Sequence, residues 1–527
     1  MREETTLRDV LIVGAGPTGL SLAITCRRFG LEARVIDRAP KVSEVSKALA
    51  VWSGSLEAFD AMGIIGAFLA EGVRMRGVRF GDGKHQLTDL EMGDGIDSPY
   101  PFPILLPQSD TERLLHDRLV ELGGEVERDV ELTAIEQDGD GVTATLKMPE
   151  GREERSRFAF VVGCDGARSV VRHQLQVPFE GYTEERTFVL CDAKLQGDLD
   201  PTHIHVWWHG GGSVALFPIR DGIWRVFSLR EAEAGDETPT LEEMQHFLDA
   251  HGPENLRLID PTWLSAFRIN ERLAAHYRVG RCFLAGDAAH VHSPAGGQGM
   301  NTGIQDGVNL GWKLAQVLQG VGEPDLLLDS YEAERRPVAR EVVEGAGQML
   351  HVAFGNNPLL RIAKDVLIPI LSHVPALKRK LQVRLSETAI VYHDGPLVQL
   401  GGVPHAHAAR GEAGTRALDA ALRDPATGRD QRLWSILAGA HHTLLLFGDG
   451  ASLADAARIA ATAGDRLKTF TIDSSNDPDG HVRKRYGIEN PGWILVRPDQ
   501  VIAARGEADD TARLEAYVAR VLLASAS

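Results

Sequence analysis

The N-terminal part of the chain alternates between continuous apolar runs and a stretch of mixed apolar and polar positions. Residues 10–13 are Val-Leu-Ile-Val, and such an uninterrupted run is typical of a parallel strand buried on both faces. A glycine-rich turn follows, and then a helical stretch to Arg28, because Gly30 stands where a glycine commonly ends a helix. Residues 33–36 form the next apolar run. The pattern therefore predicts a strand, a helix and a second strand.

Alternating apolar and polar positions mark two further regions of the chain. Segments 77–103 and 182–267 contain runs such as HIHVWWHG, GSVALFPI and IWRVFSL, in which successive side chains would point to opposite faces of a strand. We predict that these segments form an antiparallel substrate-binding sheet. It would be inserted into a discontinuous first domain made of residues 1–76, 104–181 and 268–345.

The rest of the chain is first helical and then mixed in pattern. Apolar residues recur near every 3.6 positions in residues 299–318, and residues 346–393 form a further helical segment. Residues 394–412 are rich in Gly, Pro, His and Ala, which indicates a linker. Residues 413–527 then alternate between apolar strands and Ala-rich helices. We predict a separate, small α/β domain there.

The charge balance narrows the choice of partners. The chain has 56 Lys and Arg against 74 Asp and Glu, a net charge of −18. This excess disfavours nucleic acid and anionic lipid as partners. No apolar run reaches about 18 residues, so no membrane span is expected. The first ten residues contain no apolar signal region, which favours a cytoplasmic protein.

The cysteines favour the same compartment. They are widely scattered, with no CxxC and no metal-ligand spacing. We therefore expect buried, reduced thiols and no metal site. The four are Cys26, Cys164, Cys191 and Cys282.

A nucleotide-binding fingerprint lies between the first predicted strand and helix. Gly14, Gly16 and Gly19 form a GxGxxG, which permits a tight turn, the approach of a pyrophosphate and close packing of helix on strand. Asp37 ends the next strand, where its carboxylate can accept hydrogen bonds from ribose hydroxyls. The spacing predicts a dinucleotide but does not separate FAD from NAD. The neighbouring residues that we assign to the same site are Pro17, Thr18 and Arg38.

Two later motifs favour FAD. Gly286 and Asp287 end an apolar strand, and the aspartate offers acceptors for a polyhydroxy chain such as ribitol, which FAD has and NAD lacks. A glycine-rich stretch then leads into a helix, whose free backbone amides suit the electron-rich N1/O2 edge of a flavin. The candidate cofactor contacts in this stretch are Pro294, Gly297, Gly299, Met300 and Asn301.

With these motifs the chain resembles the class A flavoprotein aromatic hydroxylases, the para-hydroxybenzoate hydroxylase superfamily. It is most similar to the phenol, pentachlorophenol and polyketide hydroxylase branch. Residues 162–169 carry the Asp-Gly signature, in which Asp165 would touch both FAD and the nicotinamide cofactor. Residues 107–113 resemble the segment whose glutamine, here Gln108, contacts the flavin, and residues 329–337 resemble the helix that closes the FAD domain. The match covers about residues 1–395.

One departure from the family concerns the cations near the pyrophosphate. The family often has Ser-Arg-Ala and then Arg-Thr-Leu-Glu, whereas this chain has Lys47 in the first motif and Gly54 at the second arginine. Lys47 keeps one cation for the pyrophosphate, but as a point charge without the arginine fork. The changed contacts to the pyrophosphate bear on how far the bound flavin can move.

The resemblance implies the fold and the activity. We expect a Rossmann-like FAD-binding domain of the GR2 type, the inserted antiparallel sheet, and a C-terminal thioredoxin-like domain that lacks CxxC. The implied enzyme is a single-component monooxygenase that uses FAD, NADPH or NADH, and O2. It would hydroxylate a phenolic or polyketide-type aromatic substrate through the flavin C4a-hydroperoxide. A homodimer is among the assemblies left open.

Candidate substrate contacts come from the inserted sheet, which faces the flavin in this family. Alternation along a strand lets only one of the adjacent Trp207 and Trp208 line a pocket. No substrate-activating base is identified, and His290 and His292 are weak candidates for handling a proton. The substrate contacts that we predict are Trp208, Phe217, Trp224 and Pro294.

Other activities on the same fold remain open. Baeyer–Villiger oxidation, epoxidation and antibiotic inactivation use the same motifs. A flavin-dependent halogenase is disfavoured because its Trp-x-Trp-x-Ile-Pro motif is missing. A non-catalytic flavin-binding or redox-sensing protein is the alternative from a different class. The motifs leave the substrate, its regiochemistry and the choice between NADPH and NADH open.

Overall fold

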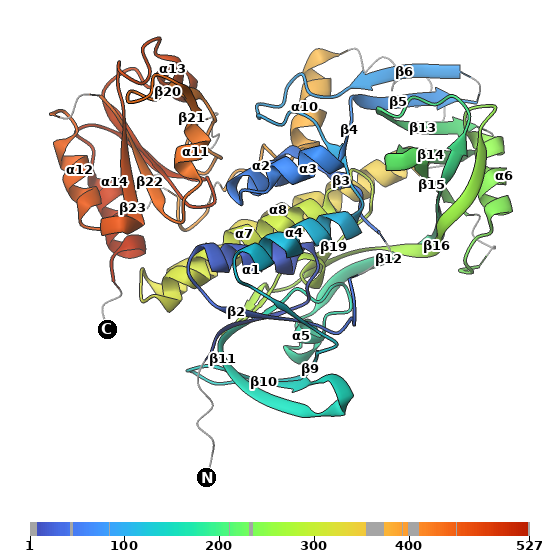
Figure 1. The fold of residues 1–527 in the computed structure, drawn as a ribbon, viewed down its shortest axis with the longest axis horizontal. Helices are drawn as coiled ribbons and strands as arrows, with labels where there is room; N and C mark the ends of the chain where they lie inside the picture. Colours follow the sequence, from blue (N-terminus) through green and yellow to red (C-terminus); the bar gives the residue numbers. More distant parts are fainter. Residues whose placement is uncertain are drawn as a thin grey trace.

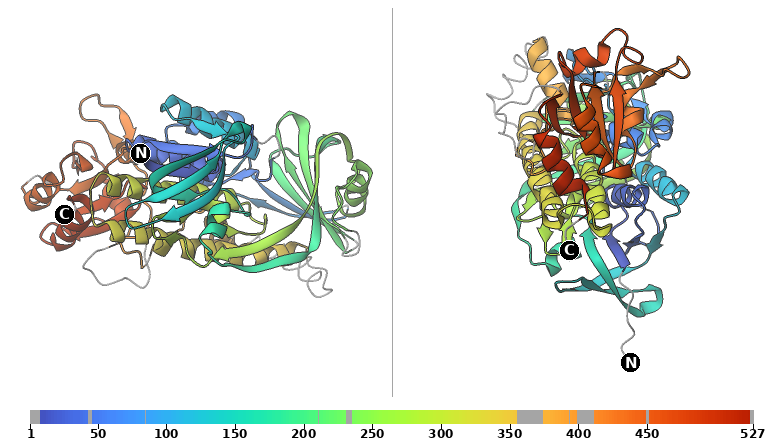
Figure 2. Two further views of the ribbon diagram at one scale, coloured as in Figure 1. Left: turned by 90° about the horizontal axis from the view of Figure 1, so that it is seen from below. Right: turned by 90° about the vertical axis from the view of Figure 1, so that its left-hand side faces the viewer.

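The computed structural model describes most of the chain. The described residues are 8–42, 46–83, 85–209, 211–230, 235–354, 374–392, 394–398, 411–448 and 451–524. Three parts lie along the long axis, with the inserted sheet and the C-terminal domain at opposite ends and the N-terminal strands and long helices between them (Figures 1 and 2).

A parallel sheet forms the centre of the first domain. The strand order is β8-β2-β1-β11-β18-β17, and β1, β2, β8, β11 and β18 run parallel because helices and loops connect them. Helix α1 (Pro17–Arg28) follows β1, which confirms the predicted strand, helix and strand. Gly30, at φ +79°, follows the end of α1 as expected. The strands are β1 (Arg8–Val13), β2 (Ala33–Asp37), β8 (Val126–Arg128), β11 (Glu153–Gly163), β17 (Arg278–Val279) and β18 (Cys282–Leu284).

Smaller elements complete this domain. Strands β9 and β10 extend the sheet beside β11, and β3, β7 and β4 form a separate three-stranded sheet. Helix α4 packs beside α1, and α2 and α3 cover the small sheet's side of the domain (Figure 1). Their bounds are β3 (Ala50–Val51), α2 (Ser53–Ala61), α3 (Ile65–Glu71), β4 (Val73–Arg74), β7 (Ile104–Leu105), α4 (Gln108–Glu121), β9 (Glu131–Gln137), β10 (Val142–Lys147) and α5 (Val170–Gln174).

The second large sheet has the order β19-β16-β12-β15-β14-β13-β5-β6. Helix α6 (Leu241–His251) packs on one of its faces. The long strands β12 and β16 run from this sheet back into the first domain, so the predicted boundaries at 181/182 and 267/268 fall inside continuous strands. The strands are β5 (Gly77–Asp82), β6 (His85–Glu91), β12 (Phe179–Gln196), β13 (His203–His209), β14 (Gly212–Pro218), β15 (Ile223–Leu229), β16 (Arg257–Ala274) and β19 (His290–Val291).

Two long helices lie between the sheets and the C-terminal domain. Helix α7 (Gly299–Leu318) matches the predicted range, and α8 (Pro324–Phe354) crosses it with Pro337 inside. Helix α10 (Pro375–Leu385) follows. Within the predicted helical segment 346–393 and linker 394–412, residues 355–373, 393 and 399–410 lie outside the described residues.

The C-terminal domain is built on a four-stranded sheet of order β23-β22-β24-β25, in which β24 runs antiparallel to its neighbours. With helices α12, α13 and α14 this is the thioredoxin-like arrangement that the family resemblance implied. Trp312 of α7 and Leu327 of α8 belong to the same buried apolar cluster as one face of this sheet. The elements are β20 (Ala421–Arg423), β21 (Asp430–Arg432), α11 (Leu433–Leu437), β22 (His442–Phe447), α12 (Ala454–Ala461), β23 (Leu467–Ile472), α13 (His481–Tyr486), β24 (Gly492–Val496), β25 (Ile502–Glu507) and α14 (Ala512–Tyr517).

From the sequence we expected no membrane span, no metal site and no disulfide. Among the described residues, no helix has the length and apolar character needed to cross a membrane, and no cluster of His, Cys, Asp or Glu could hold a metal ion. The four cysteines are free; Cys164 is half-buried and the other three are buried.

Candidate cofactor and active site

The three fingerprint glycines have different surroundings. A Cβ at Gly14, where φ is +106°, would lie 2.3 Å from the Cys164 carbonyl oxygen, and one at Gly19 would lie 2.0 Å from the Gly14 carbonyl oxygen. A Cβ at Gly16 would meet no atom within 4 Å. Helix α1 also begins at Pro17 without a side-chain cap, which leaves its first-turn amides free. Open space at Gly16 beside free amides fits a pyrophosphate.

Asp37 has a second role besides the predicted one. One carboxylate oxygen accepts from the Ala15 amide and the other from the Ala39 amide, both at 2.8 Å. The side chain therefore fixes the glycine-rich turn. Each oxygen has a further lone pair, so contact with a ribose hydroxyl remains compatible with this geometry. Arg38 is exposed beside it.

The Gly286–Asp287 turn packs against the fingerprint helix. Gly286 has φ +58°, and a Cβ there would lie 2.3 Å from Thr18 Oγ1. The Thr18 side chain thus supports this turn and does not project into open space. Asp287 is reached by solvent but is surrounded by protein, which raises the pKa of its carboxyl, while His290 and Lys47 act in the opposite direction. Lys47 therefore lies close enough to Asp287 to stabilise its carboxylate.

The start of α7 also presents unsatisfied amides. The helix begins at Gly299, and its N-cap residue Gln298 makes no side-chain capping bond. Asn301 is fully committed to protein: its side chain accepts from the Trp52 amide at 2.8 Å and donates to the carbonyls of Ala50 and Gly297. A contact between Asn301 and a cofactor would therefore use its backbone.

Gln108 is similarly engaged. It donates to Glu112 at 2.8 Å and accepts from the Ala48 amide at 3.3 Å. Segment 46–47 is held from the other side by Arg225, which donates to both carbonyl oxygens of that segment and forms a bidentate pair with Asp192. The sequence motifs did not reveal this anchor. Its signal is a buried arginine in the otherwise apolar strand IWRVFSL.

The Asp-Gly signature lies beside the fingerprint. Asp165 accepts from the Val170 amide at 2.6 Å through Oδ2, whereas its Oδ1 is buried without a hydrogen-bond partner. An orphaned carboxylate oxygen can accept from a ligand hydroxyl. Buried Arg172 bridges the two motifs, because it donates to the carbonyls of Ala167 and Ala288. Arg172 was not among the residues predicted from the sequence.

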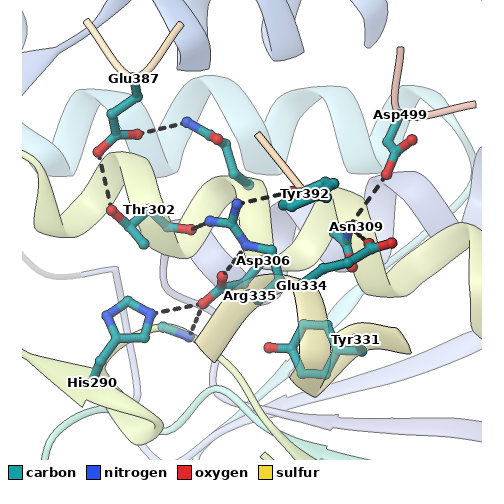
Figure 3. A network of polar contacts seen from close by, with 12 residues as sticks. His290, Thr302, Asp306, Asn309, Tyr331, Glu334, Arg335, Glu387, Tyr392 and Asp499 are labelled. Carbon is teal, nitrogen blue, oxygen red and sulfur yellow. Dashed lines mark hydrogen bonds and ion pairs between the residues drawn. The ribbon is translucent and has the colours of Figure 1, made fainter. Parts of the chain in front are cut away.

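A buried hydrogen-bond network around Asp306 supports the Gly286 turn; Figure 3 shows Asp306 with His290 and Arg335. Asp306 on α7 accepts from the Gly286 amide at 3.1 Å, from His290 Nε2 at 2.8 Å and from Arg335 Nε at 2.7 Å. Burial by itself would raise the pKa of Asp306, but Arg335 and His290 keep it below its usual value. The sequence motifs did not point to Asp306, although an aspartate within an apolar helix is a visible signal.

The geometry gives both candidate histidines structural partners. His290 is buried and bonded to Asp306. His292 Nδ1 lies 2.7 Å from the Ser293 carbonyl, so Nδ1 carries the proton. Burial lowers the pKa of His292 to about 4, which keeps it neutral and makes it a weak base near pH 7. This arrangement favours positioning over proton transfer for both.

The predicted substrate aromatics lie on two faces of the inserted sheet. Trp224, like Trp207, packs in a buried cluster with residues of α6. The contact of Trp224 with the substrate stays a prediction, and the structure shows the ring buried against α6. Phe217 lies on the opposite face, in a cluster that includes Ala295 of the loop before α7. Trp208 lies on the same face as Phe217, towards β5 and with its ring beside Phe80.

The face that carries Phe217 is broad and aromatic; we call it the aromatic face. It adjoins the exposed Pro294 and the half-buried Ala295. Four of its large rings, Phe188, Phe227, Trp263 and Phe267, were not predicted. Their signal was weak, because periodicity separates the two faces of a strand but does not say which one meets the first domain. The aromatic face comprises Phe188, Leu190, Val206, Ala215, Phe217, Phe227, Leu229, Trp263, Phe267 and Ile269.

These features fit FAD as a group. The elements that carry them contact one another, since Cys164 abuts Gly14 and Thr18 abuts Gly286. Together they offer two uncapped helix starts, open space at Gly16, the Asp287 carboxylate and the Asp165 oxygen that has no hydrogen-bond partner. A dinucleotide with a polyhydroxy chain matches acceptors and amides placed in this way.

Comparison with known proteins gives matches over the whole chain. A family model described as FAD binding domain matches residues 8–346, and one described as aromatic-ring hydroxylase, C-terminal, matches residues 410–524. The 6-methylpretetramide 4-monooxygenase of Streptomyces rimosus is 36% identical, with 96% of this chain and 92% of that protein aligned. The pentachlorophenol 4-monooxygenase of Sphingobium chlorophenolicum is 32% identical, with 95% and 94% aligned.

A solved structure is similar over the full length. The crystal structure of aklavinone-11 hydroxylase in a ternary complex with FAD and aklavinone has a TM-score of 0.80 and 27% identity, and the match covers 99% of each chain.

Proposed function

The chain belongs to the FAD-dependent aromatic-ring hydroxylases, and from this we propose that it hydroxylates a fused-ring, polyketide-type phenol with NAD(P)H and O2 as co-substrates. Membership makes it an FAD-dependent monooxygenase. The substrate class, the nicotinamide co-substrate and single-component operation are the parts that we propose.

One observation carries the substrate class. Phe217, Trp263 and Phe267 are half-buried on the aromatic face, so their rings keep surface for a ligand next to Pro294 and Ala295. Flat aromatic ligands gain about 0.5–1.5 kcal/mol per ring contact beyond area burial. A wall of several rings therefore suits a fused-ring substrate better than a single small phenol. The relatives that act on a pretetramide and on aklavinone support the same choice.

The chain's residues would bind, orient and exclude water, while bound FAD supplies oxygen activation and transfer. We assign pyrophosphate binding to Gly14, Gly16 and the start of α1. The flavin edge would meet the amides at the start of α7, and Asp287 would accept from the ribitol. Arg225 keeps segment 46–47 in place, so Lys47 remains close to Asp287.

NAD(P)H would bind transiently. The sequence has one GxGxxG that follows a strand and opens a helix, and that one is assigned to FAD. A nicotinamide cofactor without a Rossmann domain of its own would have to reach the flavin from the surface, and Asp165 is the residue that the family resemblance assigns to contact with it. Homodimer formation stays a prediction, for which sedimentation of the full chain is the direct test.

The decisive experiment uses the purified full chain. We expect a yellow protein that oxidises NAD(P)H faster when tetracyclic or anthracyclic phenols are added, with products about 16 mass units heavier, the mass of one added oxygen atom. A chain that takes up no FAD would refute the proposal. Products identified by NMR as ring hydroxylation, and not as lactones or epoxides, separate hydroxylation from the same-fold alternatives. Simple phenols serve as the comparison panel for the substrate class.

A further inference from the structure

We infer that the C-terminal domain positions the FAD-binding turn through two adjacent residues of α8, so that Arg497 and Glu334 are positioning residues for the cofactor site. The domain lacks any cysteine, so dithiol chemistry does not explain its presence. The identity of the ligand rests on the proposed function. The mechanical link rests on contacts within the protein alone.

The first half of the link is a buried clamp between domains. Arg497, in the turn after β24, donates to both carboxylate oxygens of Glu334 at 2.6 and 2.8 Å. Asp499 in the same turn accepts from the Arg497 guanidinium, which fixes the orientation of its fork. Asn309 and Lys313 of α7 donate to the same Glu334 Oε2, each at 2.8 Å. The clamp thus joins the C-terminal domain to both long helices.

The second half begins at the next residue along α8. Arg335 donates from Nε to Asp306 at 2.7 Å, from Nη1 to the Tyr392 hydroxyl and from Nη2 to the Thr302 carbonyl, both at 3.1 Å. All three directions of its guanidinium are therefore used. Asp306 then holds the Gly286 amide and His290. In Figure 3, Glu334 is linked through Asn309 to Asp499, and Arg335 is linked through Asp306 to His290.

The energetics favour coupling between the two halves. Glu334, Arg335, Asp306 and Lys313 have fully buried side chains, so none can exchange its partner for water. Without Arg497, the buried carboxylates of Glu334 and Asp499 are left with Lys313 as their nearby cation, so one buried negative charge is uncompensated. The local response is a shift or rotation of α8 that lets water reach Glu334. Because Arg335 is rigidly fixed to the same helical turn, such a shift displaces Asp306 and releases the Gly286 turn.

The test compares Arg497→Met with a matched control, Arg520→Gln. Arg520 also bonds α8's N-terminal side to the C-terminal domain, through Glu323, but this pair is exposed and lies outside the buried network around Asp306. Amide hydrogen exchange of the apo-protein is measured for peptides covering residues 284–291. We expect Arg497→Met, and not Arg520→Gln, to exchange faster there and to weaken FAD binding about tenfold, within the range of remote coupled substitutions.

Milder variants keep the test informative if Arg497→Met does not fold. Arg497→Lys retains charge without the fork, and Glu334→Gln retains shape, so each should give a smaller increase in exchange at the same peptides. The visible circular dichroism of bound flavin should change with them. Exchange at 284–291 and an FAD dissociation constant equal to those of Arg520→Gln in all three variants would overturn the inference. A protein that never binds FAD would refute the proposed function, whereas the apo-protein exchange would still decide the link.

Discussion

Gly16 and Gly19 are three positions apart, yet their surroundings predict opposite effects of the same substitution. A Cβ at Gly19 would overlap the Gly14 carbonyl at 2.0 Å, whereas a Cβ at Gly16 meets nothing within 4 Å, and Gly16 has φ −77°, which any residue adopts. The requirement for glycine is therefore one of packing at Gly19 and one of ligand approach at Gly16.

We predict that Gly19→Ala lowers the melting temperature of the apo-protein by several degrees, as overpacking by about 1–3 kcal/mol would. Gly16→Ala should leave the apo-protein's melting temperature within about one degree and still weaken FAD binding at least tenfold. Differential scanning fluorimetry of apo-protein and flavin titration measure the two effects. Normal FAD affinity in Gly16→Ala would show that the pyrophosphate does not lie there.

The buried residue Glu387 makes the stability of the protein depend on pH. Its carboxyl is buried against Thr302 and Gln305 of α7 and lies near Arg335 of α8, while its backbone and Cβ pack against Gly54 of α2. Burial raises its pKa to about 8, although these hydrogen bonds and Arg335 oppose the shift and Asp306 adds to it. The folded protein therefore retains a proton that the unfolded chain releases above pH 4.5, and stability contributed by Glu387 is lost as pH rises from there towards 8.

Glu387→Gln removes this titration. The melting temperature of the variant relative to the wild type should rise by a few degrees between about pH 6 and about pH 9. Parallel thermal melts at both pH values measure the difference. The reverse sign, or parallel pH profiles for the two proteins, would contradict the assignment. Glu334 is the internal comparison: although burial opposes it, Arg497 and Lys313 lower its pKa to about 2, so its contribution is lost only on acidification.

At the scale of elements, the inserted sheet separates packing from recognition by strand alternation. Phe217 of β14 pairs with Arg225 of β15, so the adjacent Trp224 points to the opposite face. Trp224 packs towards α6, and Phe217 packs towards the loop before α7. The first face is sealed by a helix. The second meets the loop before α7, and three of its rings, Phe217, Trp263 and Phe267, remain half-buried.

We predict different kinetic signatures for alanine at these two positions. Trp224→Ala should cost about 3–5 kcal/mol of stability, as for a large buried aromatic, with little change in the KM of the folded enzyme. Phe217→Ala should cost less stability, because the ring is half-buried, and should raise KM for the aromatic substrate several-fold. Steady-state kinetics and denaturant titrations measure both. A raised KM in Trp224→Ala alone would place the substrate on the α6 side.

At the scale of the whole molecule, the C-terminal domain shares its core with the first domain. Trp312 and Leu327 pack into the cluster under the four-stranded sheet, and Glu334 and Lys313 meet Arg497. The domain has its own sheet, but residues of α7 and α8 pack against one face of that sheet. The domain boundaries predicted from the sequence, two of which fall inside β12 and β16, remain a prediction about which parts of the chain fold together.

Deleting the chain after residue 398 tests this shared core. We expect the truncated protein to lose several kcal/mol of stability and to aggregate, since apolar residues become exposed and Glu334 loses Arg497. Thermal melts, light scattering and turnover of the full chain and the truncated form give the comparison. Unchanged stability, oligomeric state and activity after truncation would show that the domain is an independent appendage.

Local signals in the sequence were enough to place the elements that carry the motifs. The range of α7 and the strand and helix around Gly14 follow from periodicity and from backbone positions that only glycine occupies. These features depend on residues close in the chain. The Gly286–Asp287 motif and the glycine-rich stretch before α7 then favoured FAD over NAD, and the family resemblance supplied the monooxygenase activity.

The tertiary structure decided which side chains work together. Asp306 lies 29 positions from Arg335, Arg225 lies 178 from Lys47, and Arg497 lies 163 from Glu334. No local pattern specifies such pairings, because they form only when separate elements dock and lose water together. The sequence by itself determined the cofactor-binding motifs and the kind of elements that bear them. Docking decided that Trp224 faces α6, that Asn301 and Thr18 support the protein itself, and that a distant domain is fixed to the Gly286 turn.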